Sequence, residues 1–347
     1  MTITIGAYDT NTLQNVVRNI PVAVNFWRKL AFPGVQTFDS EKISFDVISK
    51  GRRMAPFVAP NVQGKPLKSQ GFTTESFSPA YIKPKTPVDP SRVLKRQAGE
   101  MFGGSLSPGQ RRNAIVADIL VEHKAMIEKR LEWMAAQAVI NGSIVVAGES
   151  YPSVTVDFGR DAGQIITLSG ATLWTASTGV PLTNLETWYR QTALLSTTHI
   201  RDLVFGATAW VAFVTNPQVA AMMDIRRGSD LGNGMEISNG LGTQDVVAYK
   251  GQLPNGPRMW VYSDVYEDDS GTNVDMLDPT HVIGIGEVDG VQAFGAIMDA
   301  RAGYIATPMF SKMWMEEDPS VEMIMTQSAP LMVPRRINAT FRAKVAA

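Results

Sequence analysis

The residues that most often carry chemistry are few in this chain. It has no cysteine and three histidines, at His123, His199 and His281. The absence of cysteine excludes disulfides, thiolate nucleophiles and cysteine-bound zinc or iron–sulfur sites. None of the histidines lies within seven residues of another, so the sequence holds no local histidine-pair motif for a metal ion. We therefore expect no metal site and no cofactor.

Two segments have the composition of nucleotide-binding loops without their spacing. Gly64-Lys65 is followed by Pro66, where a phosphate loop needs Ser or Thr, and Ala59 stands where it needs its first glycine. The glycines of the segment 284–290 have one spacer too many for a dinucleotide fingerprint, and a strand that ends in a turn accounts for them. Neither segment supports a nucleotide site.

An acidic segment runs from Asp264 to Asp278 and suggests calcium at first sight. It lacks the alternate-position ligands and the closing glutamate of the usual calcium-binding loop, so we expect a solvated hairpin tip. No other cluster indicates acid–base or nucleophilic catalysis, and the sequence therefore favours a protein that is not an enzyme.

Composition points to a protein that needs protein partners. The 347 residues include 32 Lys and Arg against 33 Asp and Glu, a formal net charge of −1, which argues against a protein whose main task is to neutralise phosphate. Charged residues make up 19% and apolar residues 44%, which leaves more surface that favours a partner. No apolar run is long enough for a membrane span, and the N-terminus does not have the pattern of a secretory signal.

The strongest element is a helix over residues 108–141. Ser107 is a suitable N-cap, Pro108 fits the first turn, and Gly142 supplies the stop. A helix of this length is about 50 Å long. The apolar stripe is formed by Val116, Ile119, Leu120, Ile127, Leu131, Met134 and Ala138, and the opposite face by Asp118, Glu122, Lys129 and Glu132. His123 lies on or beside the stripe, where we expect a satisfied, partly buried side chain.

Residues 56–90 form the most unusual segment. Seven of these 35 residues are proline, against 13 in the other 312, which excludes a helix or a central strand. Aromatic side chains are nevertheless spread through it, at Phe57, Phe72, Phe77 and Tyr81. If the segment runs out and back, each leg of about 17 residues could reach about 55 Å. We expect these rings to pack on another chain; an irregular surface of the chain's own domain is the alternative.

The remaining patterns predict an α+β protein. Residues 11–30 suggest a short helix, a break and a second apolar piece, which docks on its own domain or on a neighbouring subunit. Alternation of period two predicts strands at 154–158 and 337–345. Residues 181–314 have the pattern of a separate α/β unit, with helices at 185–195 and 218–227, a buried strand within 203–214, and strands near 245–250, 258–263 and 281–286. Since both ends of the chain look β-rich, we expect the C-terminus to return to the first domain.

Three blocks resemble bacteriophage lambda-type major capsid proteins. They are GFTTESFSPAYIKPKTPVDP at 71–90, DIRRGS at 224–229 and MTQSAPLM at 325–332. The resemblance implies the Hong Kong 97-type phage capsid fold. It divides the chain into an N-terminal arm (1–40), an extended loop (41–100), a peripheral domain with a long spine helix (101–180), an axial domain (181–314) and a return to the peripheral domain (315–347).

The function that the resemblance implies is structural. Copies would assemble as hexamers and pentamers into an icosahedral phage head around double-stranded DNA, in the virion and, during assembly, in the host cytoplasm. Portal and scaffolding proteins would be partners, and a decoration protein is a further candidate. No membrane is involved. The expected subunit-interface residues are Phe57, Phe72, Phe77 and Tyr81 in the loop, with Arg226 and Arg227 at the end of an axial helix.

Two departures from the family and two alternatives remain. Pro334-Arg335-Arg336 stands where a lambda-type relative is acidic, so charge pairing there cannot be transferred. Lys65 and Lys68 lie where some members of the wider fold form a covalent crosslink, which lambda-type proteins lack. An encapsulin-like compartment is the alternative within the fold, and an α/β hydrolase with scattered Ser, Asp and His residues is the alternative from another class.

Overall fold

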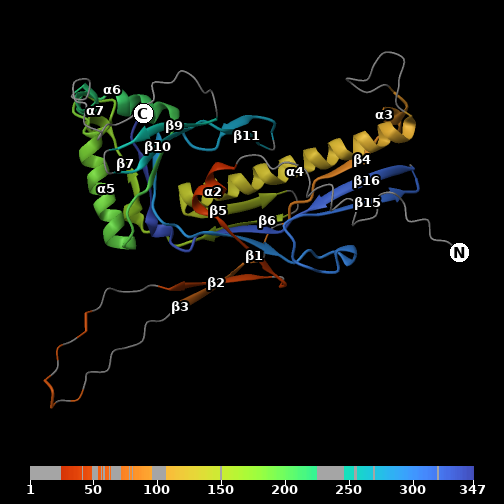
Figure 1. Ribbon diagram of the computed structural model, residues 1–347, viewed down its shortest axis with the longest axis horizontal. Helices are drawn as coiled ribbons and strands as arrows, with labels where there is room; N and C mark the ends of the chain where they lie inside the picture. The colour runs from red at the N-terminus through yellow and green to blue at the C-terminus, as the bar shows by residue number, and fades with distance from the viewer. Residues whose placement is uncertain are drawn as a thin grey trace.

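A computed structural model gives the arrangement of most of the chain (Figure 1). It describes residues 25–40, 42–48, 54–55, 57, 59–61, 63, 72–77, 79, 81–95, 107–148, 151–224, 246–253, 256–268, 270–318 and 320–347. Helices and strands are both abundant among these residues, so the predicted α+β class is confirmed.

The longest element is helix α4 (Pro108–Asn141), as the sequence predicts. The Ser107 hydroxyl accepts a hydrogen bond from the Gln110 N–H, and the Gln110 side chain accepts one from the Ser107 N–H, which makes a complete capping box. Gly142 ends the helix in a left-handed conformation with φ 71°. The whole predicted apolar stripe is buried. Glu132, which we expected on the polar face, is also buried, because it holds the start of another helix.

A three-stranded antiparallel sheet covers the N-terminal half of α4. Its strands, in sheet order, are β15 (Phe310–Glu316), β16 (Val321–Gln327) and β4 (Lys85–Val88), and α3 (Pro90–Leu94) follows β4. Ile324 of β16 packs with Ile115, Val116 and Ile119 of α4. Strand β4 contains Pro87 and lies at the edge of the sheet, which is where a proline can be accommodated.

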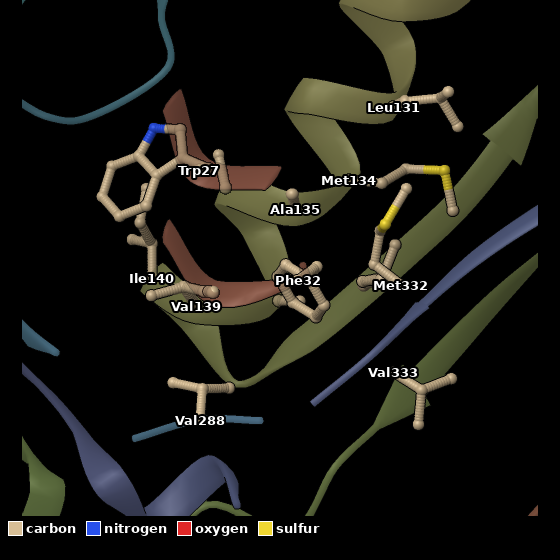
Figure 2. Packing of buried hydrophobic residues seen from close by; sticks show 14 of the residues in the cluster. Trp27, Phe32, Leu131, Met134, Ala135, Val139, Ile140, Val288, Met332 and Val333 are labelled. Carbon is tan, nitrogen blue, oxygen red and sulfur yellow. The ribbon is translucent and has the colours of Figure 1, made fainter. Parts of the chain in front are cut away.

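The main core surrounds the C-terminal half of α4. The elements around it are α2 (Phe26–Ala31), the sheet β1 (Gly34–Phe38), β14 (Val291–Gly295) and β17 (Pro330–Val333), and the hairpin β5 (Ser143–Gly148) and β6 (Tyr151–Asp157). In Figure 2, Trp27 and Phe32 lie beside Ala135 and Val139 of the helix. Met332 lies on the side of Phe32 that faces away from Val139. Strand β6 confirms the strand predicted at 154–158. The second apolar part of residues 11–30 forms α2, which packs on α4 of the same chain.

A six-stranded mixed sheet forms the second core. Its strands, in sheet order, are β7 (Ile165–Thr167), β18 (Thr340–Lys344), β13 (His281–Ile285), β8 (Asp202–Phe205), β10 (Arg258–Tyr262) and β9 (Val247–Gln252). Helices α5 (Pro181–Ser196), α6 (Ala207–Thr215) and α7 (Pro217–Asp224) accompany it. A small antiparallel hairpin, β11 (Val265–Glu267) and β12 (Asn273–Asp275), follows β10.

The sheet pairs strands from both sides of the expected boundaries at 181 and 315. Strands β7 and β18 both join the strands of 181–314. The division into arm, loop, peripheral and axial parts therefore stays a prediction. The C-terminal strand is also shorter than predicted, because residues 337–339 form a 3₁₀ turn in which the Thr340 hydroxyl donates to the Ile337 carbonyl at 2.7 Å.

The segment before β4 projects from the body. Strands β2 (Ile43–Ile48) and β3 (Phe72–Phe77) pair only with each other among the described strands and point away from α4, below it in Figure 1. The predicted excursion out and back is therefore present at its base.

Gly284 offers a test of how tightly the second core is packed. A Cβ atom there would lie 2.0 Å from the Phe341 ring. We expect Gly284→Ala to lower the free energy of unfolding of the unassembled subunit by about 1–3 kcal/mol, since overpacking displaces buried neighbours.

Urea unfolding of the purified subunit measures this effect, with Gly109→Ala as the matched control. A Cβ at Gly109 meets nothing within 4 Å, and alanine favours a helix, so the control should be unchanged or slightly more stable. Equal stability of the two variants would contradict the packing argument.

Candidate subunit interfaces

The expected loop residues divide into exposed and internally packed side chains. Phe57 is 103% exposed and Met54 is 88% exposed, so neither is covered by the described part of the chain. Phe72 pairs with Ile48 across the β2–β3 ladder, and its side chain lies outside the described residues. The large apolar side chain of Phe57 is therefore not buried by any residue that the structure describes.

Phe77 and Tyr81 are used within the subunit. Phe77 is half-buried against the main core. The Tyr81 hydroxyl donates to the Ala296 carbonyl at 2.6 Å and accepts from the Met298 N–H at 3.1 Å. These two aromatic residues hold the stem of the loop to the body, which the aromatic pattern alone did not indicate. Arg226 and Arg227 lie outside the described residues, two and three positions after the end of α7.

A buried polar cluster fixes α2 on α4. The Glu132 carboxylate accepts hydrogen bonds from the backbone N–H of Trp27 at 2.7 Å and of Arg28 at 3.3 Å, so it satisfies donors that a helix start leaves free. Glu128 accepts from the Asn25 amide at 2.9 Å and pairs with the Arg28 guanidinium. Burial raises the pKa of the Glu132 carboxyl, against the opposing effect of these N–H groups and of Arg28.

His123 is fully buried. Its ring contacts β4 and β16 directly, and β15 through a further hydrogen bond. Its Nε2 lies 2.8 Å from the Thr86 hydroxyl of β4, and its Nδ1 lies 3.3 Å from the Thr326 hydroxyl of β16. Thr326 in turn lies 3.0 Å from the Ser311 hydroxyl of β15. The prediction of a satisfied histidine is confirmed, and its side chain is fully buried where partial burial was expected. Burial lowers its pKa, with a weaker opposing effect of Glu122.

Arg160 closes the C-terminal end of α4. Its guanidinium donates to the carbonyls of Ile140, at 2.8 Å, and Val139, and to the Thr340 hydroxyl at 2.7 Å. A cation at this end stabilises the free carbonyls of the helix. Burial, with a smaller contribution from Arg342, lowers the pKa of Arg160 to about 9. No sequence pattern pointed to this contact, because the β5–β6 hairpin separates Arg160 from the end of α4 and Thr340 lies 180 positions away.

The segments that resembled nucleotide or calcium loops have packing roles. In the 284–290 segment, a Cβ at Gly286 would lie 2.8 Å from the His199 carbonyl, and one at Gly290 would lie 2.4 Å from the Phe32 ring. The glycines are therefore required by close approach of other elements. The acidic segment forms the β11–β12 hairpin, as predicted, and Asp268 accepts hydrogen bonds within its turn. Within the described part of the chain, no group of three potential ligands could hold a metal ion.

A groove lies beside α5 on the described surface. Its volume is about 1060 Å³, and it lies between α5, residues 199–201 and residues 252–258. We call it the α5 groove. Apolar side chains form its floor, and Arg190, Arg201 and Arg258 line it. Of the described helices, none is long and apolar enough to cross a membrane.

Solved structures place this arrangement among phage capsid proteins. The crystal structure of a prophage capsid protein from Escherichia coli CFT073 has a TM-score of 0.73 at 26% identity, covering 98% of this chain and 99% of that one. A phage-related protein from Bordetella bronchiseptica shares the fold, with a TM-score of 0.52 at 14% identity over 97% of each chain. The predicted Hong Kong 97-type capsid fold is thus confirmed.

The sequence comparisons identify the family. The profile of the phage major capsid protein E family matches residues 9–345. The major capsid protein of Escherichia phage lambda is 32% identical over 312 residues, and that of Escherichia phage N15 is 31% identical over 321 residues. Each alignment covers 88% of this chain and 89% of the relative. The chain belongs to the phage major capsid protein E family, and the predicted lambda-type resemblance is confirmed.

The burial of His123 predicts a pH dependence of subunit stability. Because its pKa is lowered in the folded state, the unfolded chain binds the proton first as the pH falls below about 6.5. The free energy of unfolding should therefore decrease between pH 7.5 and pH 5, as measured by urea unfolding at each pH.

Replacement of the imidazole separates this contribution from others. In His123→Gln, the free energy of unfolding should decrease less between pH 7.5 and pH 5. Part of the decrease should remain, because burial also lowers the pKa of His281. His199→Gln, at an exposed position, is the control for loss of a histidine. An unchanged slope in His123→Gln would contradict the assignment.

Proposed function

We propose that this chain is the shell-forming subunit of a phage head, assembling as hexamers and pentamers into an icosahedral capsid around double-stranded DNA. The observation that carries the proposal is the family match over residues 9–345, together with a fold that agrees over 98% of the chain with a prophage capsid protein. A shell subunit repeats heterologous contacts that close into rings and extend a lattice. Its role is structural, and no catalytic step is assigned to it.

The projecting loop is the part that we assign to contact with a neighbour. Phe57 and Met54 are exposed among the described residues of this segment, while Phe77 and Tyr81 fix its stem to the body. A loop that is rigid at its base and apolar where it projects is suited to clamp another subunit. Many such modest contacts act together in a closed shell.

The other partners follow from the family and from charge. Portal and scaffolding proteins take part during assembly in the host cytoplasm, and the finished subunit resides in the virion. The net charge of −1 suits a genome that is packaged without sequence-specific or strong basic contacts. A decoration protein, where the phage has one, would dock around residues 1–10 and 45–85. Residues 2–5 alternate in sequence as a short strand does, and a strand edge left exposed can accept another strand.

Electron microscopy of the expressed protein tests the proposal directly. Icosahedral particles are expected, and particles from infected or packaging-competent cells should protect double-stranded DNA from nuclease. Particles filled with a cargo protein would instead indicate an encapsulin-like compartment. A monomer that turns over a substrate would indicate the hydrolase.

The loop clamp predicts that two exposed side chains matter more for assembly than for folding. Phe57→Ser combined with Met54→Ser should leave the free energy of unfolding of the subunit within about 0.5 kcal/mol, since both are exposed surface positions. The yield of stable shells, measured by sedimentation, should fall.

The matched control is Leu94→Ser in α3, which removes an apolar side chain that is 75% exposed and lies after the projecting β2–β3 segment. It should assemble normally. Loss of assembly in the control, or none in the loop variant, would count against the clamp.

Arg226 and Arg227 give a second test of assembly against folding. Both follow α7, where cations favour the helix dipole, so changing both to Ala should cost well under about 1 kcal/mol of subunit stability. We expect a larger effect on particle yield, because the segment lies in the proposed axial domain. Parallel losses in thermal melting and in particle yield would favour the dipole role alone.

A further inference from the structure

The α5 groove is rich in hydrogen-bond donors and poor in acceptors. The guanidinium groups of Arg190 and Arg201 are exposed on its lining, and the buried Tyr189 hydroxyl has no hydrogen-bond partner among the described residues. Arg258 is held by the carboxylate of Asp202, with a 2.8 Å hydrogen bond from its Nη2, and therefore belongs to the body of the subunit. These features favour a partner that brings carboxylates.

The remaining charges of the groove do not cancel this preference. Among the described residues that line the groove, Glu186 is the one acidic residue, and it lies one turn before Arg190 on α5. Arg201 is only loosely paired, since its Nη2 lies 3.8 Å from Glu287 and both side chains are about half exposed. Arg190 forms no ion pair with another described residue. The apolar floor, with Leu182, Leu185 and Leu253, adds area that a docking segment would bury.

The β11–β12 hairpin has the complementary character. Six acidic residues lie between Asp264 and Asp278, and no Lys or Arg occurs between Arg258 and Arg301. Three of the six already have a role within the subunit: Asp264 pairs with Lys129, Asp268 accepts in the turn, and Asp278 accepts from Thr280.

Two of the others face solvent. The register pairs Val265 with Asp275 and Glu267 with Asn273, so these four side chains share one face of the hairpin, and all four are exposed. Tyr266 points to the other face, where its ring packs near Trp133 of α4 at 6.2 Å. The outward face therefore presents two carboxylates around one apolar side chain, on a hairpin that is anchored from behind.

Groove and hairpin lie on opposite flanks of the same sheet. In Figure 1, α5 lies to the left of strands β7 and β10, and β11 lies to their right. A contact between two different patches on opposite flanks is heterologous, and its repetition by rotation closes a ring. One copy of the chain therefore carries two different patches that could meet in a heterologous contact.

We propose that the acidic β11–β12 hairpin of one subunit seats in the basic α5 groove of the next copy around a capsomer. Glu267 and Asp275 then face Arg190 and Arg201, and Val265 meets the apolar floor. The inference rests on the proposed function, since it needs copies arranged in rings. It adds the two surfaces through which each subunit contacts the next around the ring. Their complementary charges would speed the association of two subunits and disfavour a neighbour bound in the reverse orientation.

Charge reversal tests the contact. Arg190→Glu/Arg201→Glu and Glu267→Lys/Asp275→Lys should each reduce the yield of shells about tenfold, because like charges then face each other. The combination of all four substitutions should restore most of the yield. Thermal melting of the unassembled subunits checks that each variant folds, and Arg190→Glu alone, which breaks no described ion pair, should act in the same direction if the double variant is unstable.

A mismatched combination is the control. Arg190→Glu/Arg201→Glu joined with Glu317→Lys, an exposed position in the turn after β15, should not regain assembly. Normal assembly of either double variant, or no rescue by the fourfold variant, would overturn the inference while the unchanged chain still forms shells. If the unchanged chain forms no shells, the proposed function fails and this contact fails with it.

One competing occupant gives a different pattern. If the groove binds the phosphates of DNA, the groove variant would lose binding of a double-stranded DNA fragment and the hairpin variant would assemble normally. That result would overturn the proposal.

Discussion

Burial of α4 from Ile115 to Ile140 is the constraint on which the rest of the structure depends. Its N-terminal half requires the β15–β16–β4 sheet, and its C-terminal half requires α2, the β5–β6 hairpin and β17. A helix of 34 residues cannot be covered by one element, so segments far apart in the chain converge on it. The order of these segments along the helix fixes where the loop leaves the body and where it returns.

Polar groups in this interface make the arrangement specific. His123, Glu128 and Glu132 are buried on α4; His123 has its partners on β4 and β16, and both glutamates have theirs at the start of α2. A buried polar group without its partner costs free energy, so a shifted register of α2 or of β16 would leave these groups unsatisfied. The apolar contacts supply most of the driving force, and the polar contacts select one packing.

The sequence predicts those features that depend on local pattern. The capping box, the glycine stop and the apolar stripe of α4 could be assigned because each is written within a few neighbouring residues. Glu132 was misplaced on the polar face because its partner, the start of α2, lies about a hundred positions away. The same limit applies to Arg160 at the end of α4, to the glycines that approach Phe32 and Phe341, and to Tyr81, whose hydroxyl is used at Ala296.

The two stems of the projecting loop end in two different sheets. Strand β1, before the loop, pairs with β14 in parallel, and strand β4, after it, pairs with β16. A force that pulls on the loop along β1 and β4 would act on all the hydrogen bonds of the β1–β14 and β4–β16 pairs at once. The strands would not separate one hydrogen bond at a time. The force would then reach the β1–β14–β17 sheet and the β15–β16–β4 sheet, which pack on opposite halves of α4. If a neighbour holds the loop, as proposed above, a force on the loop would pass to both of these sheets.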